Sequence, residues 1–215
     1  MRQIAVLVEG QTEEAFVSQV LQPWLSEQGD YICRPIIVTT SRTPAGVKTR
    51  GGGRHWRLYA DDLRKLLAGP HWHKVGLLLD YYAFPSDGPG AHERGASRDR
   101  HRRMTEALRA AHPDRRFVPC LALHEFETWV IAASSLTPGF ISSAWDVAIE
   151  ALTNECSGGF EVINDGRDTA PSKRLALIDE HYDKVRDGVL MVEAAGLDAV
   201  AEACPVLKEW LESLL

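Results

Sequence analysis

Short apolar runs rich in β-branched residues alternate with amphipathic stretches along the first part of the chain. Four such runs predict strands, at 4–8, 32–39, 74–80 and 117–123. Runs that are apolar at nearly every position are typical of strands buried on both faces of a parallel sheet. Apolar residues at three- and four-residue spacing predict helices at 15–25, 56–67, 98–111 and 125–133. This alternation predicts an α/β fold, with a parallel-dominated sheet and helices on both faces.

The pattern changes after residue 134. Three further stretches predict helices, at 145–154, 172–182 and 197–214, and one short strand-like segment lies at 160–163. We therefore expect an α/β core over residues 1–135. A mostly helical C-terminal part over 136–215 would pack on this core, and the two together would form one structural domain. The Gly-, Thr- and Arg-rich stretch 41–53 predicts a mobile loop.

The composition is that of an ordinary globular chain. Of its 215 residues 45% are hydrophobic and 25% are charged, which is enough to bury a full core. No apolar run approaches the ~20 residues that a membrane-spanning helix needs, so we expect no membrane partner. The first apolar stretch is interrupted at Glu9, which makes it a poor signal peptide. Four widely spaced cysteines without a C-x-x-C pair favour reduced thiols and a cytoplasmic location.

Charge is unevenly distributed along the chain. The net charge of −6 argues against a protein that binds nucleic acid over its whole surface. Two stretches are nevertheless basic: Arg42, Lys48, Arg50, Arg54 and Arg57 in the first, and Arg94, Arg98, Arg100, Arg102 and Arg103 in the second. Each stretch is either a solvated loop or a patch that steers a phosphate backbone to one face. The candidate substrate-binding residues of the first stretch are Arg42, Lys48, Arg50 and Arg54.

Acidic residues follow three of the predicted strands. Glu9 follows the first strand, with Glu13 one helical turn later, and Asp80 ends the third strand. Glu125 and Glu127 follow the fourth, and they share a face if the strand continues but not if the segment is helical. Ligands of parallel α/β sheets bind at the carboxyl ends of strands. Converging carboxylates need a cation, and oxygen ligands suit Mg²⁺ or Mn²⁺.

Two other features are candidate chemistry. The segment 164–174 predicts a turn and a capped helix, but its adjacent Lys173 and Arg174 would also suit a phosphate at a helix N-terminus. His124 is either a general base or a hydrogen-bonded residue near the core. The chain contains no Walker A, G-x-S-x-G or G-x-G-x-x-G motif, so the common nucleotide-binding and hydrolase signatures are absent from its sequence.

Six segments of the chain carry a resemblance to known families. IAVLVEG (4–10) and VGLLLD (75–80) resemble the two signature segments of the Toprim fold. More closely, VEGQTEE (8–14), DYYAFP (80–85), HEFE (124–127) and TAPSKRL (169–175) resemble the bacterial domain of unknown function 4276. The resemblance implies a Toprim-like sheet and a Mg²⁺-dependent nuclease. It also implies an association with ATPases in mobile-element and phage-defence loci.

The resemblance also implies roles for individual residues. Glu9 matches the Toprim glutamate and Asp80 the first aspartate of its Asp-x-Asp pair, but Tyr82 stands at the second aspartate position. Glu125 or Glu127 would replace the missing carboxylate. A lysine used by overcoming-lysogenization-type nucleases, a related Toprim group, matches Lys173 by role.

These observations lead to one main hypothesis and two others. The main one is a metal-dependent phosphodiesterase acting on DNA or RNA, with Glu9, Asp80 and Glu127 (or Glu125) holding Mg²⁺ or Mn²⁺. The second is a non-catalytic Toprim-like module that binds a partner ATPase or nucleic acid. The third is an enzyme that uses the same cluster on free nucleotides. The residues proposed to carry catalysis are Glu9, Glu13, Asp80, Glu125, Glu127 and Lys173, with His124 and Arg174 in substrate binding.

Overall fold

The centre of the molecule is a four-stranded parallel sheet. The computed structural model describes residues 1–42, 48–52, 54–156, 159–162 and 169–215. The strands lie in the order β2-β1-β5-β6, and their bounds are Arg2–Val8 (β1), Tyr31–Ile37 (β2), Trp72–Asp80 (β5) and Phe117–Ala122 (β6). All three pairings are parallel, so every strand ends at the same edge of the sheet. The predicted α/β class and parallel sheet are confirmed.

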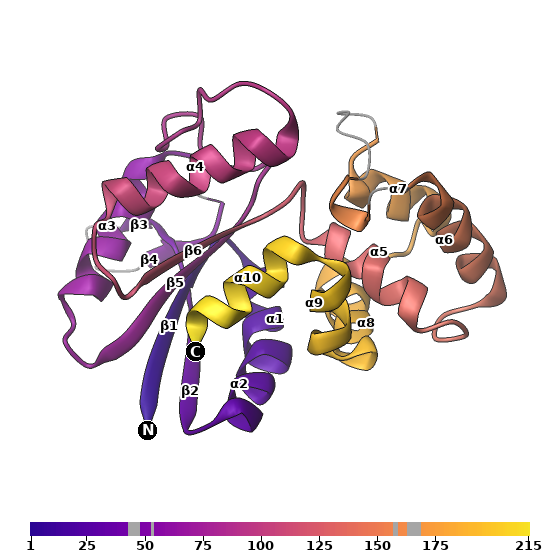
Figure 1. Ribbon diagram of the computed structural model, residues 1–215, viewed down its shortest axis with the longest axis horizontal. Helices are drawn as coiled ribbons and strands as arrows, with labels where there is room; N and C mark the ends of the chain where they lie inside the picture. The colour runs from indigo at the N-terminus through magenta and orange to yellow at the C-terminus, as the bar shows by residue number, and fades with distance from the viewer. Residues whose placement is uncertain (43–47, 53, 157–158, 163–168) are drawn as a thin grey trace.

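Both faces of the sheet are covered, which explains the apolar runs. Ile4, Val6 and Val8 enter one hydrophobic cluster, and Leu7 enters the other. The first cluster includes α1 (Gln11–Phe16), the π-helical η1 (Val17–Leu21) and α2 (Gln22–Gln28). The second includes α3 (Trp56–Ala68) and α4 (Ser97–Ala111). Figure 1 shows these two groups on opposite faces, consistent with a Toprim-like fold.

The C-terminal part is helical and returns to the sheet. Its helices are α5 (Glu127–Leu136), α6 (Ser143–Glu155), α7 (Pro171–Ile178), α8 (Val189–Ala195), α9 (Leu197–Ala203) and α10 (Pro205–Leu214). α10 lies against β6 (Figure 1), where the Trp210 Nε1–H donates to the Val118 oxygen at 3.2 Å. One hydrophobic cluster runs from the sheet into these helices. None of the described helices is long and apolar enough to cross a membrane.

Two expectations for the C-terminal part are wrong. Phe160–Val162 is a short 3-10 turn and not part of a strand, because the Glu161 carboxylate is turned toward the Val206 N–H, and residue 163 lies outside the described residues. The single helix expected at 197–214 is two helices, because Pro205 interrupts the chain between α9 and α10. The sequence also gave no sign of the π-helical segment η3 (Lys184–Gly188), which runs into α8.

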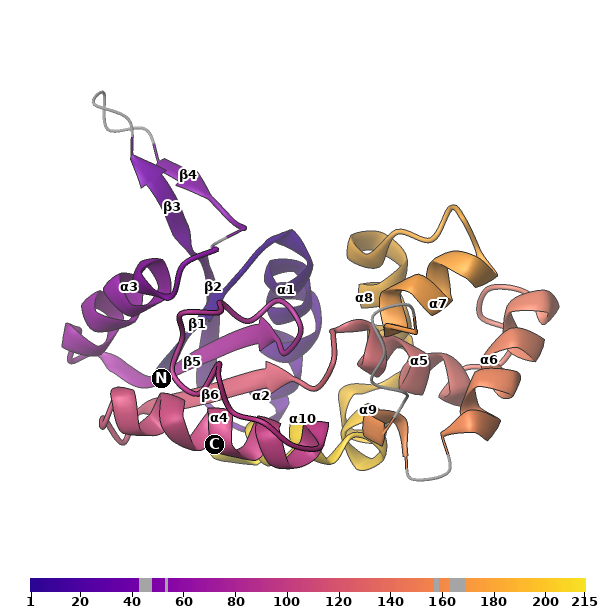
Figure 2. The same ribbon diagram turned by 90° about the horizontal axis from the view of Figure 1, so that it is seen from above.

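The stretch expected to be a mobile loop contains a β-hairpin. β3 (Thr39–Arg42) pairs antiparallel with β4 (Lys48–Arg50), and residues 43–47 lie outside the described residues. Figure 2 shows the two strands extending away from the sheet and helices. The prediction failed because these short segments lack the apolar run by which the other strands were predicted. Pairing between the two strands of the hairpin supplies their backbone hydrogen bonds instead.

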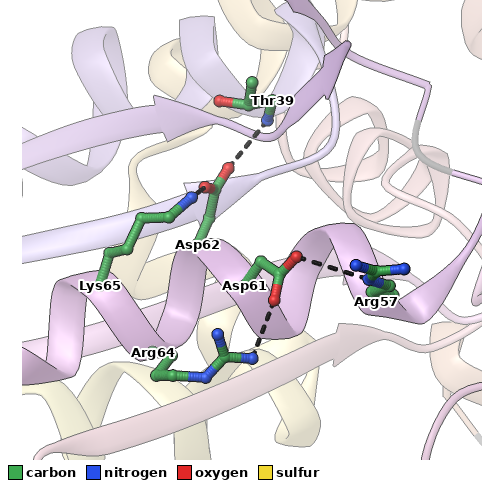
Figure 3. A network of polar contacts seen from close by, with 6 residues as sticks. All are labelled: Thr39, Arg57, Asp61, Asp62, Arg64 and Lys65. Carbon is green, nitrogen blue, oxygen red and sulfur yellow. Dashed lines mark hydrogen bonds and ion pairs between the residues drawn. The ribbon is translucent and has the colours of Figure 1, made fainter. Parts of the chain in front are cut away.

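The hairpin base is fixed to the body of the protein. The Asp62 carboxylate accepts the Thr39 N–H at 2.9 Å and an ammonium hydrogen of Lys65 at 2.6 Å (Figure 3). The Gly51 N–H donates to the Val38 oxygen at 3.0 Å, and the Val38 N–H donates to the Val8 oxygen at 2.9 Å. The hairpin therefore leaves the sheet at the edge where β1 ends.

Candidate functional site

The sheet order brings the predicted acids to one edge. β1 and β5 are adjacent, with Val8 opposite Leu78, so Glu9 and Asp80 follow neighbouring strand ends. β6 lies on the other side of β5, with Ala122 opposite Asp80. Glu127 starts the helix that follows β6. Three carboxylates separated by long stretches of sequence thus reach one side of the molecule, as expected for the carboxyl ends of a parallel sheet.

The turn after β1 fixes Glu13 as well as Glu9. Gly10 is the N-cap of α1, and its N–H donates to the Glu13 Oε2 at 2.9 Å, while the Glu14 N–H donates to the Gly10 oxygen. The Glu13 carboxylate thus accepts one of the backbone N–H groups left without a helical partner at the start of α1, and this supports the first helical turn. The Glu13 side chain is buried and faces the cluster, so it contributes both a cap and a negative charge.

A left-handed residue separates the roles of Glu125 and Glu127. His124 has a φ of 70°, and this ends the strand and redirects the chain. The Phe126 N–H then donates to the Asp80 Oδ1 at 2.7 Å. The Glu125 Oε2 accepts the Ser172 N–H at 2.9 Å, at the start of α7. Glu127 is 1% exposed and faces the cluster. The open alternatives are resolved: Glu127 begins the helix, and Glu125 precedes it.

A lysine that the sequence did not single out lies between two of the acids. The Lys184 Nζ is 3.9 Å from the Asp80 Oδ2 and 3.7 Å from the Glu127 Oε1, and its side chain is 39% exposed. It is the first residue of η3, whose π-helical form was not predicted. No local motif marks Lys184, because its position depends on how the C-terminal helices fold back on the sheet.

The lysine does not neutralise the cluster. Burial raises the pKa of Glu9 to about 6, with repulsion from Glu13 adding to the rise and Lys184 opposing it. Burial likewise raises the pKa values of Asp80 and Glu127, against the effect of Lys184. Burial alone would lower the pKa of Lys184, but Glu127 and Asp80 raise it above its usual value. Negative charge is therefore in excess at this edge of the sheet.

The predicted basic residues Lys173 and Arg174 lie on α7, where the N-terminal Ser172 N–H binds Glu125. Arg174 forms an ion pair with Glu155 at 2.7 Å and donates to the Thr169 oxygen at 2.9 Å, so it has a structural role in joining α7 to α6. Lys173 is exposed on the same helix. The ammonium group that contacts Asp80 and Glu127 belongs to Lys184.

The remaining predicted residues fall into two groups. His124 is 1% exposed and hydrogen-bonded, as the second alternative from the sequence described it. The basic residues Arg42, Lys48 and Arg50 lie on the hairpin, and Arg54 is exposed in the segment that leads to α3. The end of the hairpin lies beside the backbone of Glu9. A Cβ atom added at Gly51 would be 3.4 Å from the Glu9 carbonyl oxygen.

The donor set fits a hard cation that is shared with a phosphate. Within the described part of the chain, no three His, Cys, Asp or Glu side chains stand together in an arrangement that could hold a metal. Mg²⁺ commonly uses only one or two protein carboxylates, with water and substrate phosphate as its other ligands. The buried Glu127 Oε2 has no hydrogen-bond partner among the described residues, and such an orphaned oxygen suits a cation.

Comparisons with known proteins identify one match. The family model described as a domain of unknown function, DUF4276, matches residues 8–215, which include every carboxylate of the cluster and Lys184. No curated protein and no solved structure matches the chain.

The excess charge predicts how stability depends on pH. The folded-state pKa of Glu9, about 6, lies above its ordinary value of 4.5, so the folded protein binds its proton more tightly than the unfolded chain does. The contribution of Glu9 to the free energy of unfolding therefore falls as the pH rises through this window. We expect Glu9→Gln to be about 1 kcal/mol more stable than wild type at pH 8, after solvent screening is allowed for, and to lose this advantage at pH 4.

Urea unfolding at the two pH values, with a chelator present, measures this difference. Glu150→Gln, an exposed change on α6, is the control and should shift neither value. If Glu9→Gln changes the free energy of unfolding equally at both pH values, the pKa of Glu9 is not raised in the folded protein.

Proposed function

The chain belongs to the DUF4276 family, and we propose that it is a metal-dependent phosphodiesterase that acts on nucleic acid in the cytoplasm. One observation carries the proposal: Asp80 and Glu127, from two different strand ends, face a single ammonium group, and the half-buried Glu9 follows the neighbouring strand end. An arrangement with more negative charge than its own lysine can balance is suited to recruit a further cation.

Each residue has a separate part in this proposal. Asp80 and Glu127 would supply the first oxygen ligands, with Glu9 available from the neighbouring strand end, and the Phe126 N–H keeps the Asp80 carboxylate in place. When bound, Mg²⁺ or Mn²⁺ would polarise a phosphate and lower the pKa of a bound water. Lys184 supplies a positive charge for the phosphate oxygens as negative charge develops on them. Its half-exposed side chain has room to turn from the carboxylates toward a substrate.

The hairpin favours a polymer over a free nucleotide. Arg42 is the register partner of Lys48 on the antiparallel hairpin, so the chain carries basic residues on both of its strands. Basic residues are the ones that neutralise a phosphate backbone. The hairpin extends from the edge of the sheet where β1 ends (Figure 2), so a strand of nucleic acid bound along it would approach that edge. A partner ATPase and a role in a defence or mobile-element system are proposed from the family resemblance.

A second function has its own support. Tyr82 stands where a Toprim site has its second aspartate, and the described side chains hold no preformed three-ligand group. These two facts favour a non-catalytic module that binds an ATPase or nucleic acid. Calorimetric titration with Mn²⁺ separates the two functions, because a module without a metal site gives no binding heat at millimolar metal. Turnover of free nucleotides but not polymers would instead indicate the third, nucleotide-processing function.

The first prediction concerns the carboxylates. We expect Asp80→Asn and Glu127→Gln each to reduce Mg²⁺- or Mn²⁺-dependent cleavage of DNA or RNA at least about 100-fold, because each removes a charged ligand. Cleavage is followed on single-stranded, double-stranded and RNA substrates, with a chelator as blank, alone and with a partner ATPase. Glu150→Gln should cleave at the wild-type rate. Full activity in both Glu9→Ala and Asp80→Asn would exclude the assignment.

The second prediction concerns Lys184, which plays two opposed parts. Lys184→Met removes a cation that competes for Asp80 and Glu127, so we expect Mn²⁺ to bind about tenfold more tightly. The same change removes the charge that stabilises the phosphate, so cleavage should fall about 100-fold. Calorimetry and the cleavage assay measure the two effects. Lys208→Met, which removes an exposed lysine paired with Glu202, should change neither. Parallel losses of binding and cleavage would assign Lys184 a structural role alone.

The third prediction concerns the hairpin. Arg42→Gln with Lys48→Gln removes two charges that we place on the phosphate backbone. We expect polymer binding to weaken for every sequence, and the slope of log affinity against log salt to fall by about 2. Hydrolysis of a small phosphodiester, bis(p-nitrophenyl) phosphate, should not change. Arg109→Gln with Arg115→Gln, two exposed arginines away from the hairpin, is the matched control. An equal change of salt slope in the control pair would show a general charge effect.

A further inference from the structure

One buried residue of the site has an unusual backbone. His124 is the single non-glycine residue with a positive φ in the part of the chain that the structure describes, at 70°. Residues with a Cβ rarely adopt this conformation, and it persists only where surrounding contacts enforce it. His124 lies three residues before Glu127, between the end of β6 and the start of α5. Its surroundings therefore decide the path of the chain into the site.

Tyr82 contacts His124 at two points. The Tyr82 N–H donates to the His124 oxygen at 3.0 Å, and the Tyr82 hydroxyl lies 3.0 Å from the His124 Nδ1. The other ring nitrogen, Nε2, is 3.3 Å from the Glu161 carbonyl oxygen. A carbonyl oxygen can only accept, so Nε2 carries the hydrogen in the neutral ring. Nδ1 is then the acceptor, and the Tyr82 hydroxyl donates to it.

Glu161 is itself held in place. Its buried carboxylate accepts the Val206 N–H through both oxygens, at 3.0 and 3.1 Å, in the first turn of α10. α10 in turn packs on β6. A chain of hydrogen bonds thus joins Tyr82, at the end of β5, through His124 to a helix that is packed on the sheet. These bonds tie the left-handed turn to elements that pack on the sheet.

The left-handed turn at His124 leads directly to two groups of the acidic cluster. Two residues after His124, the Phe126 N–H reaches the Asp80 Oδ1 at 2.7 Å, and Glu127 follows as the first residue of α5. We propose that Tyr82 and His124 are positioning residues: their hydrogen bonds hold the left-handed turn that aims the Phe126 N–H at Asp80 and places Glu127 in the cluster. The importance of this positioning for metal binding rests on the proposed function, whereas the geometry itself does not.

Tyr82→Phe tests the inference by removing only the hydroxyl. The first measurement is hydrogen exchange of the Phe126 amide by NMR, which reports the bond to Asp80 directly and needs no metal. We expect exchange to become at least about tenfold faster, because a released turn exposes this amide. The second measurement is calorimetric Mn²⁺ affinity, which should weaken about tenfold, as for other residues that orient metal ligands.

Tyr81→Phe is the matched control. The Tyr81 hydroxyl accepts a hydrogen bond from the Arg100 Nη1 at 3.0 Å and forms no hydrogen bond with His124, so this variant should keep wild-type exchange and affinity. His124→Ala removes the ring but keeps the Cβ, so the left-handed conformation stays strained while the hydrogen bonds that hold it are lost. We expect it to match Tyr82→Phe, and the double variant to be no worse than either single one.

The outcomes separate this inference from the proposed function. Unchanged Phe126 exchange in Tyr82→Phe, or wild-type exchange in His124→Ala, would overturn the positioning role, because the backbone would then hold the turn without the ring. Absence of Mn²⁺ binding in the wild-type protein would overturn the proposed metal site. In that case the exchange measurements alone would still decide whether Tyr82 and His124 hold the turn.

Discussion

Buried negative charge at one edge of the sheet is the constraint on which the rest of the structure depends. Carboxylates lose their hydration when they are buried, and they also repel one another, so each needs a donor or a cation. Asp80 receives the Phe126 N–H, Glu13 receives the Gly10 N–H, and Lys184 faces two of the acids. Burial, with the negative charge of Glu13 adding to it, still raises the pKa of Glu9 to about 6.

This constraint explains why the helical C-terminal part belongs to the site. The sheet supplies the carboxylates through its strand ends, but the lysine comes from η3, beyond α5, α6 and α7. α7 binds Glu125 through its N-terminal amide, and α10 anchors the turn at His124 through Glu161. Each of these helices therefore holds part of the acidic edge in addition to covering the core. The C-terminal helices and the α/β core can be understood only as one functional unit.

The success of sequence-based prediction follows the range of the interactions. The positions of Glu9 and Asp80 at strand ends were predictable, because a buried strand followed by an acid is a local pattern. The two residues lie at the same edge because their strands are parallel neighbours in the sheet. The choice between Glu125 and Glu127 depended on the φ of His124, which no propensity gives for a residue other than glycine. Lys184 depended on long-range packing, and the hairpin depended on pairing between two short segments. These last two contacts have no signature in the residues that make them.

Tyr82 shows how a departure from a sequence pattern can be compatible with the same site. A tyrosine at the position of a second aspartate removes one carboxylate from a cluster that already has excess negative charge. Its hydroxyl and backbone both bond to His124, so the position is used to hold the turn that carries Phe126 and Glu127. Glu127 then supplies a carboxylate from the next strand end.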